Sequence, residues 1–349
     1  MQIKDATSVT RLVSLASAIW ALFFANSLFL SRSGVSRLLR YSLASYAAIM
    51  GILSVYVIQP ESKLVASCIR AFGAYCTMKA LDLHFSRGIA FFPKYDPTAE
   101  KACSDLRMPT RDPTTGKLEG VLAYAARVTY SMRYEDFDIS VIKRDKFTNH
   151  PMRQALLSVS VLVGIAATVG VPPYMSVDSS VASAFFFLLA LHATFCGLHF
   201  LPGFEVPLFE KHFLSADSLS EFWTRHWHGL FTSPIKNLAF LPIKRLTGST
   251  AVGLCAAMAF SGLFHWFVVE AFDDPVASFR VFWFFTLQGP ACIVDNLVWG
   301  KGHKTLLRKV FAWFVMLGLA SWVVRGFPSV AVTNKDITWL VTHIHQGRI

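Results

Sequence analysis

Two short segments combine histidine with aromatic and basic residues in a way that is suited to chemistry. One is SEFWTRHWH at 220–228, and the other is SGLFH at 261–265. His265 stands inside an otherwise apolar stretch. Burial among Phe and Trp disfavours the charged imidazolium, so the neutral ring is available as a base near neutral pH. Such a histidine can accept the proton of a hydroxyl nucleophile.

Each segment also has a purely structural interpretation. A single histidine within a membrane-spanning helix is about as often a hydrogen-bonding link between helices as it is a catalytic residue. The 220–228 stretch is typical of an interfacial amphipathic helix that places Trp and Arg at the level of the lipid headgroups. The combination of the two segments in one chain favours the chemical interpretation.

The spacing of the histidines and cysteines excludes the common metal sites. No two of the 11 His residues are three or four positions apart. This removes the HxxxH boxes of di-iron membrane oxidases and the HExxH zinc helix. The sequence also lacks a CxxC pair, a DDxxD diphosphate motif and a glycine-rich phosphate loop. We therefore expect neither a metal nor a permanently bound cofactor.

The elements that must position these residues are predicted to be membrane-spanning helices. Of the 349 residues, 54% are hydrophobic and only 16% are charged, and the mean hydropathy is +0.45. An ordinary soluble domain carries about a quarter charged residues, so a soluble fold is excluded. A span needs roughly 20 mostly apolar residues, and about eight windows qualify, within a range of about seven to ten. They lie near 12–30, 41–58, 64–83, 154–173, 181–201, 250–271, 281–298 and 310–327.

These windows predict an all-α integral membrane protein with one polytopic domain over 1–349. Two connections are long, 84–153 and 202–249, and both contain weakly apolar, amphipathic stretches. The window 64–83 contains Arg70, Lys79 and Asp82, which must face protein or water if this window spans the bilayer.

The net charge of +11 is distributed asymmetrically around the windows. If alternate connections share one side of the membrane, then 31–40, 84–153, 202–249 and 299–309 together carry the whole +11. Cytosolic loops are enriched in Lys and Arg, so we assign this side to the cytosol. The assignment explains the excess without a nucleic-acid partner, and we expect a multi-pass protein of the endoplasmic reticulum.

The two segments together resemble the signature of the membrane-bound O-acyltransferase superfamily. More narrowly, they resemble its wax-synthase-like branch, which is found in plants and in fungal terpenoid and meroterpenoid pathways of secondary metabolism. Arg87-Gly-Ile-Ala is similar to an Arg-Gly element of that branch. The resemblance covers roughly 60–325, with the signature region in 200–325.

The resemblance implies roles for particular residues. It makes His265 the catalytic base and maps a second characteristic polar position, often Asn or Asp in other branches, onto His228. His226 and His228 would point to different faces of a helix, so only one is expected to reach the site.

Other residues near the signature keep two interpretations each. Ser261, one helical turn before His265, either fixes the imidazole tautomer or is a small residue that lets helices approach closely, for which Gly262 is better suited. Arg225 is the candidate for binding the phosphates of coenzyme A, but the enrichment of cytosolic loops in basic residues accounts for it without a ligand, and we favour that explanation by about two to one. Trp223 and Trp227 either line a substrate tunnel or anchor the chain at the membrane interface.

The implied reaction is acyl transfer from acyl-CoA, a co-substrate, to a hydrophobic alcohol. Acetyl-CoA and a terpenoid alcohol are the expected pair, and a long-chain wax or sterol ester synthase is the alternative within the superfamily. A transporter whose polar path contains Arg70, Lys79, His265 and Asp295 is the alternative from another class, but no inverted repeat is visible. A non-catalytic scaffold is a third possibility. The sequence does not determine the oligomeric state.

Overall fold

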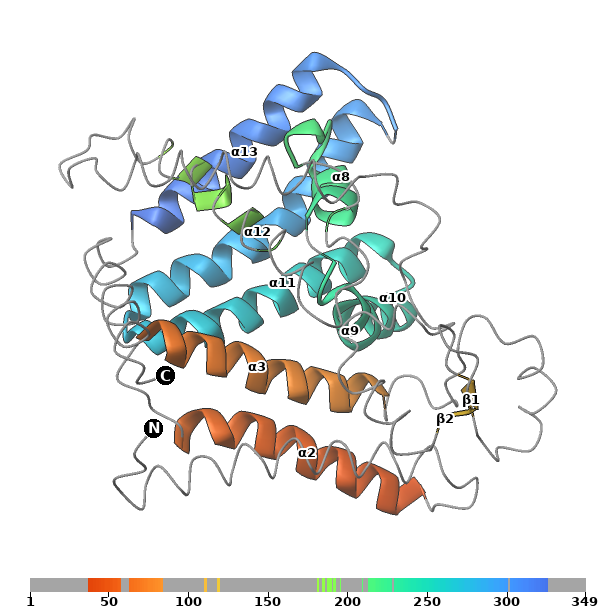
Figure 1. Ribbon diagram of the computed structural model, residues 1–349. Coiled ribbons are helices and arrows are strands. Elements are labelled where there is room, and N and C mark those ends of the chain that lie inside the picture. The colour runs from red at the N-terminus through yellow and green to blue at the C-terminus, as the bar shows by residue number, and fades with distance from the viewer. Residues whose placement is uncertain are drawn as a thin grey trace. The chain divides into compact units, whose positions relative to one another are not determined.

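The computed structural model describes two groups of helices and short segments around them (Figure 1). The chain divides into two compact units, one formed by 1–143 with 231–238 and the other by 144–230 with 239–349. The expectation of a single polytopic domain stays a prediction. The described residues are 37–57, 63–83, 110–111, 118–119, 181, 184–185, 187–189, 191–192, 195, 209, 213–227, 229–300 and 302–325.

The first unit contains two long helices that lie side by side, α2 (Arg37–Val57) and α3 (Lys63–Leu81) (Figure 1). They approach closely at Gly51, where an added Cβ would lie 2.7 Å from Thr77 Oγ1. The Thr77 hydroxyl donates to the Ala48 carbonyl at 2.9 Å, which fixes the contact between the two helices. A minimal antiparallel ladder, β1 (Thr110–Arg111) with β2 (Leu118–Glu119), belongs to the same unit.

Two charged groups at the end of α3 are buried, whereas Arg70 in the middle of the helix is half-buried. Lys79 is 1% exposed and Asp82 is fully buried. Asp82 accepts hydrogen bonds from Asn237 Nδ2 at 2.7 Å and from the Ser233 hydroxyl at 3.4 Å. The prediction that these two groups face protein and not lipid is confirmed. The short helix α9 (Thr232–Ile235) and the π-helix η6 (Lys236–Phe240) supply these partners.

The second unit holds the signature segments. Its longest helices are α11 (Thr250–Val269), α12 (Pro275–Trp299) and α13 (Leu306–Val324). Its short elements are η4 (Phe213–Ser215), α8 (Leu219–Glu221), the π-helix η5 (Phe222–His226), α10 (Leu241–Thr247) and η7 (Glu270–Phe272).

Side-chain caps define where the long helices of this unit begin. The hydroxyls of Ser249 and Thr305 accept from the backbone N–H groups three residues later, at the starts of α11 and α13. Asp274 caps α12 through the N–H groups of Val276 and Ala277, and Pro275 occupies the first turn. Helix α12 therefore begins before the predicted window 281–298, because the cap and the proline fix its start.

Three helices among the described residues are long and apolar enough to cross a membrane: 250–272, 275–299 and 306–324. Large apolar side chains remain exposed along them, among them Leu263, Leu297 and Phe314. Such faces are suited to lipid and not to water. The three predicted windows in this region are confirmed as helices of spanning length.

The remaining windows have a different status. The windows 41–58 and 64–83 coincide with α2 and α3 over their described residues. Within α2 only the shorter stretch Tyr41–Leu53 is sufficiently apolar, so the crossing of the bilayer by these helices stays a prediction. The windows 12–30 and 154–173 lie outside the described residues, and so does most of 181–201. The count of about eight spans is likewise a prediction.

Candidate active site

His265, which is half-buried, lies four residues before the end of α11 where this helix contacts α12, and its tautomer is fixed by the main chain. Its Nδ1 is 2.8 Å from the carbonyl oxygen of Ser261, one turn earlier. A carbonyl oxygen only accepts hydrogen bonds, so Nδ1 carries the proton and donates. In the neutral ring, Nε2 then holds a lone pair. This is the form of imidazole that can accept a proton.

The imidazole is held in place by aromatic packing. Its ring stacks on Phe285 of α12, with centroids 3.8 Å apart and an interplanar angle of 19°, and Phe264 meets it edge-on at 5.0 Å. These contacts, together with the bond to Ser261, restrict the ring on two sides. Fixed orientation of a base favours proton transfer because less freedom is lost in the transition state.

Close approach of α11 to α12 depends on Gly262. A Cβ at this position would lie 2.6 Å from the Phe282 carbonyl oxygen and 3.0 Å from Thr286 Oγ1. The small-residue interpretation therefore applies to Gly262. Ser261, which is buried, contributes the carbonyl that holds His265. The bond comes from its main chain, so the tautomer is fixed without the serine hydroxyl.

Trp223 connects the first signature segment to α12. Its indole Nε1 donates to Gln288 Oε1 at 3.1 Å, and its ring packs against Phe285 at 5.6 Å between centroids. The indole nitrogen is only a donor, so the amide atom that faces it must be the oxygen. The orientation of the Gln288 amide is thereby assigned from its partner.

Gln288 was not predicted as a site residue. Its side chain is fully buried, and its Nε2 makes no hydrogen bond to any residue that the structure describes. An unsatisfied buried donor costs about 1–3 kcal/mol, so proteins rarely retain one. The signal in the sequence is a carboxamide in the middle of an apolar span, a residue type that is costly in lipid and calls for a functional or packing reason.

Five residues form what we call the His265 layer: Trp223, Ser261, His265, Phe285 and Gln288. They come from three elements of the second unit, namely η5, α11 and α12. The layer combines an imidazole of fixed tautomer with an amide whose NH₂ group has no partner among the described residues. Groups of these two kinds can accept a proton from one atom and donate a hydrogen bond to another.

Trp227 and Phe222 belong to an aromatic cluster beside the layer. Their rings stack at 5.4 Å with an angle of 21°, and Trp227 meets Trp223 edge-on at 6.0 Å. Phe222 also meets Trp313 of α13 at 6.2 Å. Trp227 thus has packing partners within the protein, and its proposed role in a tunnel stays a prediction.

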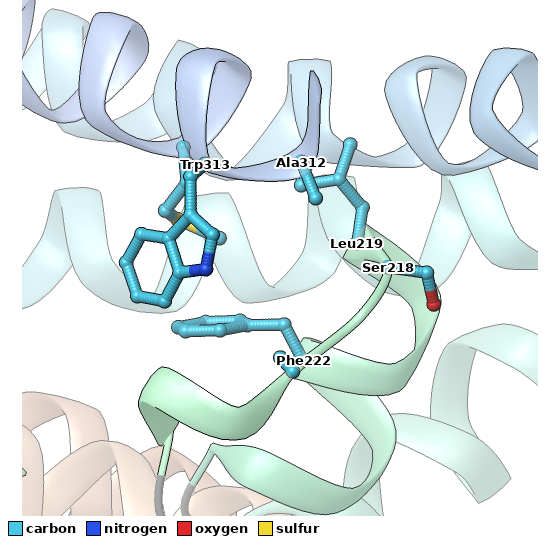
Figure 2. A pocket seen from close by; sticks show the side chains of 7 residues that line it. Ser218, Leu219, Phe222, Ala312 and Trp313 are labelled. Atoms are coloured by element: carbon cyan, nitrogen blue, oxygen red, sulfur yellow. The ribbon is translucent and has the colours of Figure 1, made fainter. Parts of the chain in front are cut away.

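A small cavity lies between α8 and α13 near this cluster. Figure 2 shows the rings of Phe222 and Trp313 facing each other across it, with Ser218, Leu219 and Ala312 nearby. Its volume of about 10 Å³ is at the lower limit for one water molecule. This cavity does not hold an acyl chain or an alcohol acceptor.

The local geometry of the first signature segment differs from the sequence prediction. Residues 222–226 form a π-helix, and the chain is extended at Trp227, with φ −103° and ψ 155°. The argument that His226 and His228 occupy different faces of one helix was therefore based on a wrong premise. His226 is fully buried, with Nδ1 3.2 Å from the Ser215 hydroxyl and Nε2 3.4 Å from Glu221 Oε1.

No described contact links the two remaining predicted residues to the His265 layer. His228 lies outside the described residues. Arg225 is exposed at the end of the π-helix. Their roles as second catalytic residue and as phosphate ligand stay predictions.

A second polar group lies at the other end of α12, and here every donor has an acceptor. Arg308 uses all of its N–H groups: Nε and Nη2 bind the two carboxylate oxygens of Asp295 at 2.8 and 3.1 Å. The remaining bonds go to Asn296 Oδ1 and to the carbonyls of Gly300 and His303. We call Asp295, Asn296 and Arg308 the Arg308 cluster.

The Arg308 cluster also holds the first signature segment. Asn296 Nδ2 donates to the Ser220 hydroxyl at 2.8 Å. Trp223, three residues on, is bound to Gln288 of the same helix. Two side-chain bonds from α12 thus set the position of the segment that carries Trp223.

A group of surface charges lies close by, at and before the start of α13. Asp217 pairs with Lys304 at 3.0 Å and with Lys309 at 3.7 Å. The hydrogen bond from Lys304 holds the pKa of Asp217 below its usual range, and the same bond raises the pKa of Lys304. Burial opposes ionisation of Glu221, but hydrogen bonds from the Asp217 N–H and from His226 hold its pKa below the usual range.

Comparison with known proteins matches the region that contains both segments. Residues 206–287 match the membrane bound O-acyl transferase family. The matched region ends one residue before Gln288. The match makes this region of the chain similar to the superfamily that the two segments resemble. With the three apolar helices, it supports an integral membrane protein.

The chain is also 30% identical over 175 residues to an uncharacterized membrane protein of Schizosaccharomyces pombe. The alignment covers 48% of this chain and 46% of that protein, so the chain spans about half the length of the relative it matches. The acyltransferase match does not favour the transporter alternative. Asp295, one residue of the suggested polar path, is bound on both oxygens by Arg308.

Proposed function

We propose that this protein transfers an acyl group from acyl-CoA to the hydroxyl of a hydrophobic alcohol, with His265 as the general base. The observation that carries the proposal is the bond from His265 Nδ1 to the Ser261 carbonyl, which leaves Nε2 as the acceptor. The match of residues 206–287 to the acyltransferase family supports the reaction class. The arrangement needs no metal.

The reaction proceeds by direct attack. The alcohol oxygen attacks the thioester carbonyl carbon while His265 Nε2 takes the hydroxyl proton. The π electrons of the carbonyl move onto its oxygen, which becomes an oxyanion. When the carbon–sulfur bond breaks, the thiolate leaves with the electron pair and takes the proton from the imidazolium. The products are an ester and free CoA, and no covalent enzyme intermediate is required.

Acetyl-CoA as donor and a terpenoid-type alcohol as acceptor are the finer part of the proposal. They follow from the resemblance of SEFWTRHWH and SGLFH to the wax-synthase-like branch. A long-chain wax or sterol ester synthase remains the second candidate. In either case we propose that Arg225 binds the CoA phosphates from the cytosolic side and that His228 contacts the acyl donor. The proposed membrane is that of the endoplasmic reticulum.

The test is an assay in membranes that contain the full-length protein. Labelled acetyl-CoA or palmitoyl-CoA is supplied with a panel of terpenoid and fatty alcohols, and ester formation is measured. We expect His265→Ala and His265→Phe to lower turnover by about 10²–10⁴-fold, because positioned acid–base groups contribute about that much. The phenylalanine variant keeps an aromatic ring against Phe285, so it separates loss of the base from loss of packing.

His303→Ala is the matched control, since this exposed histidine lies outside the His265 layer. Its turnover should equal that of the wild type. Ester formation that is unchanged in both His265 variants would overturn the role of His265. No ester from any pairing of donor and alcohol with the wild-type protein would overturn the proposed function.

A further inference from the structure

We propose that Gln288 is a second catalytic residue, whose Nε2 donates a hydrogen bond to the carbonyl oxygen of the acyl group during transfer. The inference rests on the proposed function and identifies the group that stabilises the oxyanion. It starts from the one feature of the His265 layer that its packing does not explain: a fully buried amide with half of its hydrogen-bonding capacity unused.

The direction of the free amide group follows from its partner. Trp223 Nε1–H binds the Gln288 oxygen at 3.1 Å, so the NH₂ group is turned away from the indole. A simple flip of the amide would place two donors against each other and lose the bond. Trp223 therefore keeps the donor face of Gln288 available for another acceptor.

The end groups of Gln288 and His265 lean toward the same level of the helix pair. Helices α11 and α12 are antiparallel, since Gly262 faces Phe282 and Thr286 whereas Gly289 faces Cys255. Side chains on a helix lean toward its N-terminus. His265 leans back to Ser261, as its hydrogen bond shows, and Gln288 leans back toward Phe285.

Phe285 joins the two groups at that level. Its ring stacks on His265 at 3.8 Å and meets the ring of Trp223 at 5.6 Å, and Trp223 in turn holds Gln288. The base and the amide donor thus lie on two sides of one aromatic pair. A thioester carbonyl requires a donor at its oxygen and a base at the attacking hydroxyl, and these two groups meet both needs.

The chemistry assigns one step to the amide. As the alcohol oxygen bonds to the carbonyl carbon, negative charge develops on the carbonyl oxygen, and Gln288 Nε2–H donates to it. The amide loses no proton and gains no charge. Because the donor is already dehydrated and oriented, it needs no reorganisation when the charge develops. Its unpaired state without substrate costs stability, which binding of the carbonyl relieves.

The experiment compares the wild type with Gln288→Met, which keeps the length of the side chain but has no donor. The first readout is turnover with acyl-CoA and an alcohol in membranes that contain the full-length protein. Loss of one oxyanion donor lowers kcat by about 10²–10³-fold. We expect a loss of this size in kcat, and a rise in the KM for acyl-CoA of no more than about tenfold, because the donor binds the ground-state carbonyl more weakly than the transition state.

The second readout needs no acceptor and no turnover. Binding is measured for two unreactive CoA analogues, a ketone that keeps the carbonyl and a thioether that lacks it. A net hydrogen bond corresponds to about a three- to tenfold difference in Kd. We expect the wild type to bind the ketone more tightly by about that factor, and Gln288→Met to lose the difference.

Thr286→Val is the matched control. Thr286 lies two positions earlier on α12, and its hydroxyl donates a hydrogen bond to the Phe282 carbonyl. It should keep both turnover and the preference for the ketone. The thermal midpoint is recorded for each variant. If Gln288 has only a structural role, Gln288→Met will lower the midpoint and the activity together. The ratio of the affinities for the ketone and the thioether will then stay unchanged.

The outcomes separate the two proposals. If the wild type forms esters and Gln288→Met keeps turnover within about threefold, or keeps the preference for the ketone, the role of Gln288 is overturned and the proposed function stands. If the wild type forms no ester with any donor and alcohol and does not prefer the ketone, both proposals are overturned.

Discussion

The two polar groups along α12 differ in how completely their hydrogen-bond donors and acceptors are paired. In the Arg308 cluster, every N–H of the guanidinium and both oxygens of Asp295 are bonded. In the His265 layer, one imidazole nitrogen is hydrogen-bonded to Ser261, and among the described residues the Gln288 amide is hydrogen-bonded only through its oxygen. The two groups lie in the same unit and on the same helix.

The difference distinguishes polar residues that hold the fold from residues that are available for substrate. Burial penalises an unpaired polar group, so a cluster that stabilises the fold is expected to have all of its donors and acceptors paired. A catalytic group must leave a donor or an acceptor free for the reacting atoms. By this criterion, Asp295 and Arg308 are structural although both are charged, and Gln288 is the stronger candidate although it is neutral.

The largest effect on stability is expected from opening the complete cluster. Arg308→Met leaves the Asp295 carboxylate buried without its partner, which costs about 3–5 kcal/mol. We expect a large fall in the thermal midpoint of the purified protein in detergent. Lys309→Met is the control from the next position, because Lys309 is partly exposed and its bond to Asp217 is long. Equal stability of the two variants would contradict a structural role for the Arg308 cluster.

A smaller effect is expected where the helices of the His265 layer meet. Gly262→Ala would place a Cβ 2.6 Å from the Phe282 carbonyl, so α11 and α12 must separate. Overpacking of this kind costs about 1–3 kcal/mol. Turnover should fall as well, because Phe285 would no longer hold the imidazole. The measurement is the thermal midpoint alongside ester formation.

The control for this substitution is Gly318→Ala on α13, where an added Cβ meets nothing within 4 Å. Alanine has the higher helix propensity, so this variant should be neutral or slightly stabilised. A Gly262 variant that matches the Gly318 variant in both stability and turnover would show that the helix pair tolerates a wider spacing.

The smallest effect is expected at the exposed charges beside the cluster. Lys304 holds the pKa of Asp217 below its usual range, so Asp217 binds a proton more readily in the unfolded chain than in the folded one. Its contribution to stability is therefore complete at neutral pH and is lost as pH falls below about 4. Asp217→Asn should lose this part of the pH dependence and change the midpoint only slightly at neutral pH.

This last prediction is measured as the thermal midpoint of both proteins from neutral pH down to acid. High salt should reduce the difference between them, since exposed charges are screened. An unchanged acid dependence in Asp217→Asn would assign the loss of stability at low pH to other carboxylates. A large difference at neutral pH would mean that the pair belongs to the structural cluster.

The sequence by itself determined the long apolar helices of the second unit and one half of the proposed chemistry. Runs of apolar residues act within one or two turns, so the helices at 250–269 and 306–324 were predictable from neighbouring residues. The cap of α12 at Asp274 with Pro275 is equally local, but the predicted window 281–298 did not include it. His265 was predictable as well, because a lone histidine inside an apolar span is conspicuous. So were the buried positions of Lys79 and Asp82, since lipid excludes unpaired charges.

Only the tertiary structure decided which polar groups are paired and which are free. Trp223 and Gln288 are 65 positions apart, and their bond depends on how the π-helix packs on α12. Sequence spacing does not encode such a pairing, and it gave the wrong premise for His226 because the segment is not a regular α-helix. A hydrogen bond depends on distance and direction, which are set by the packing of whole helices, whereas a helix depends on its own neighbouring residues.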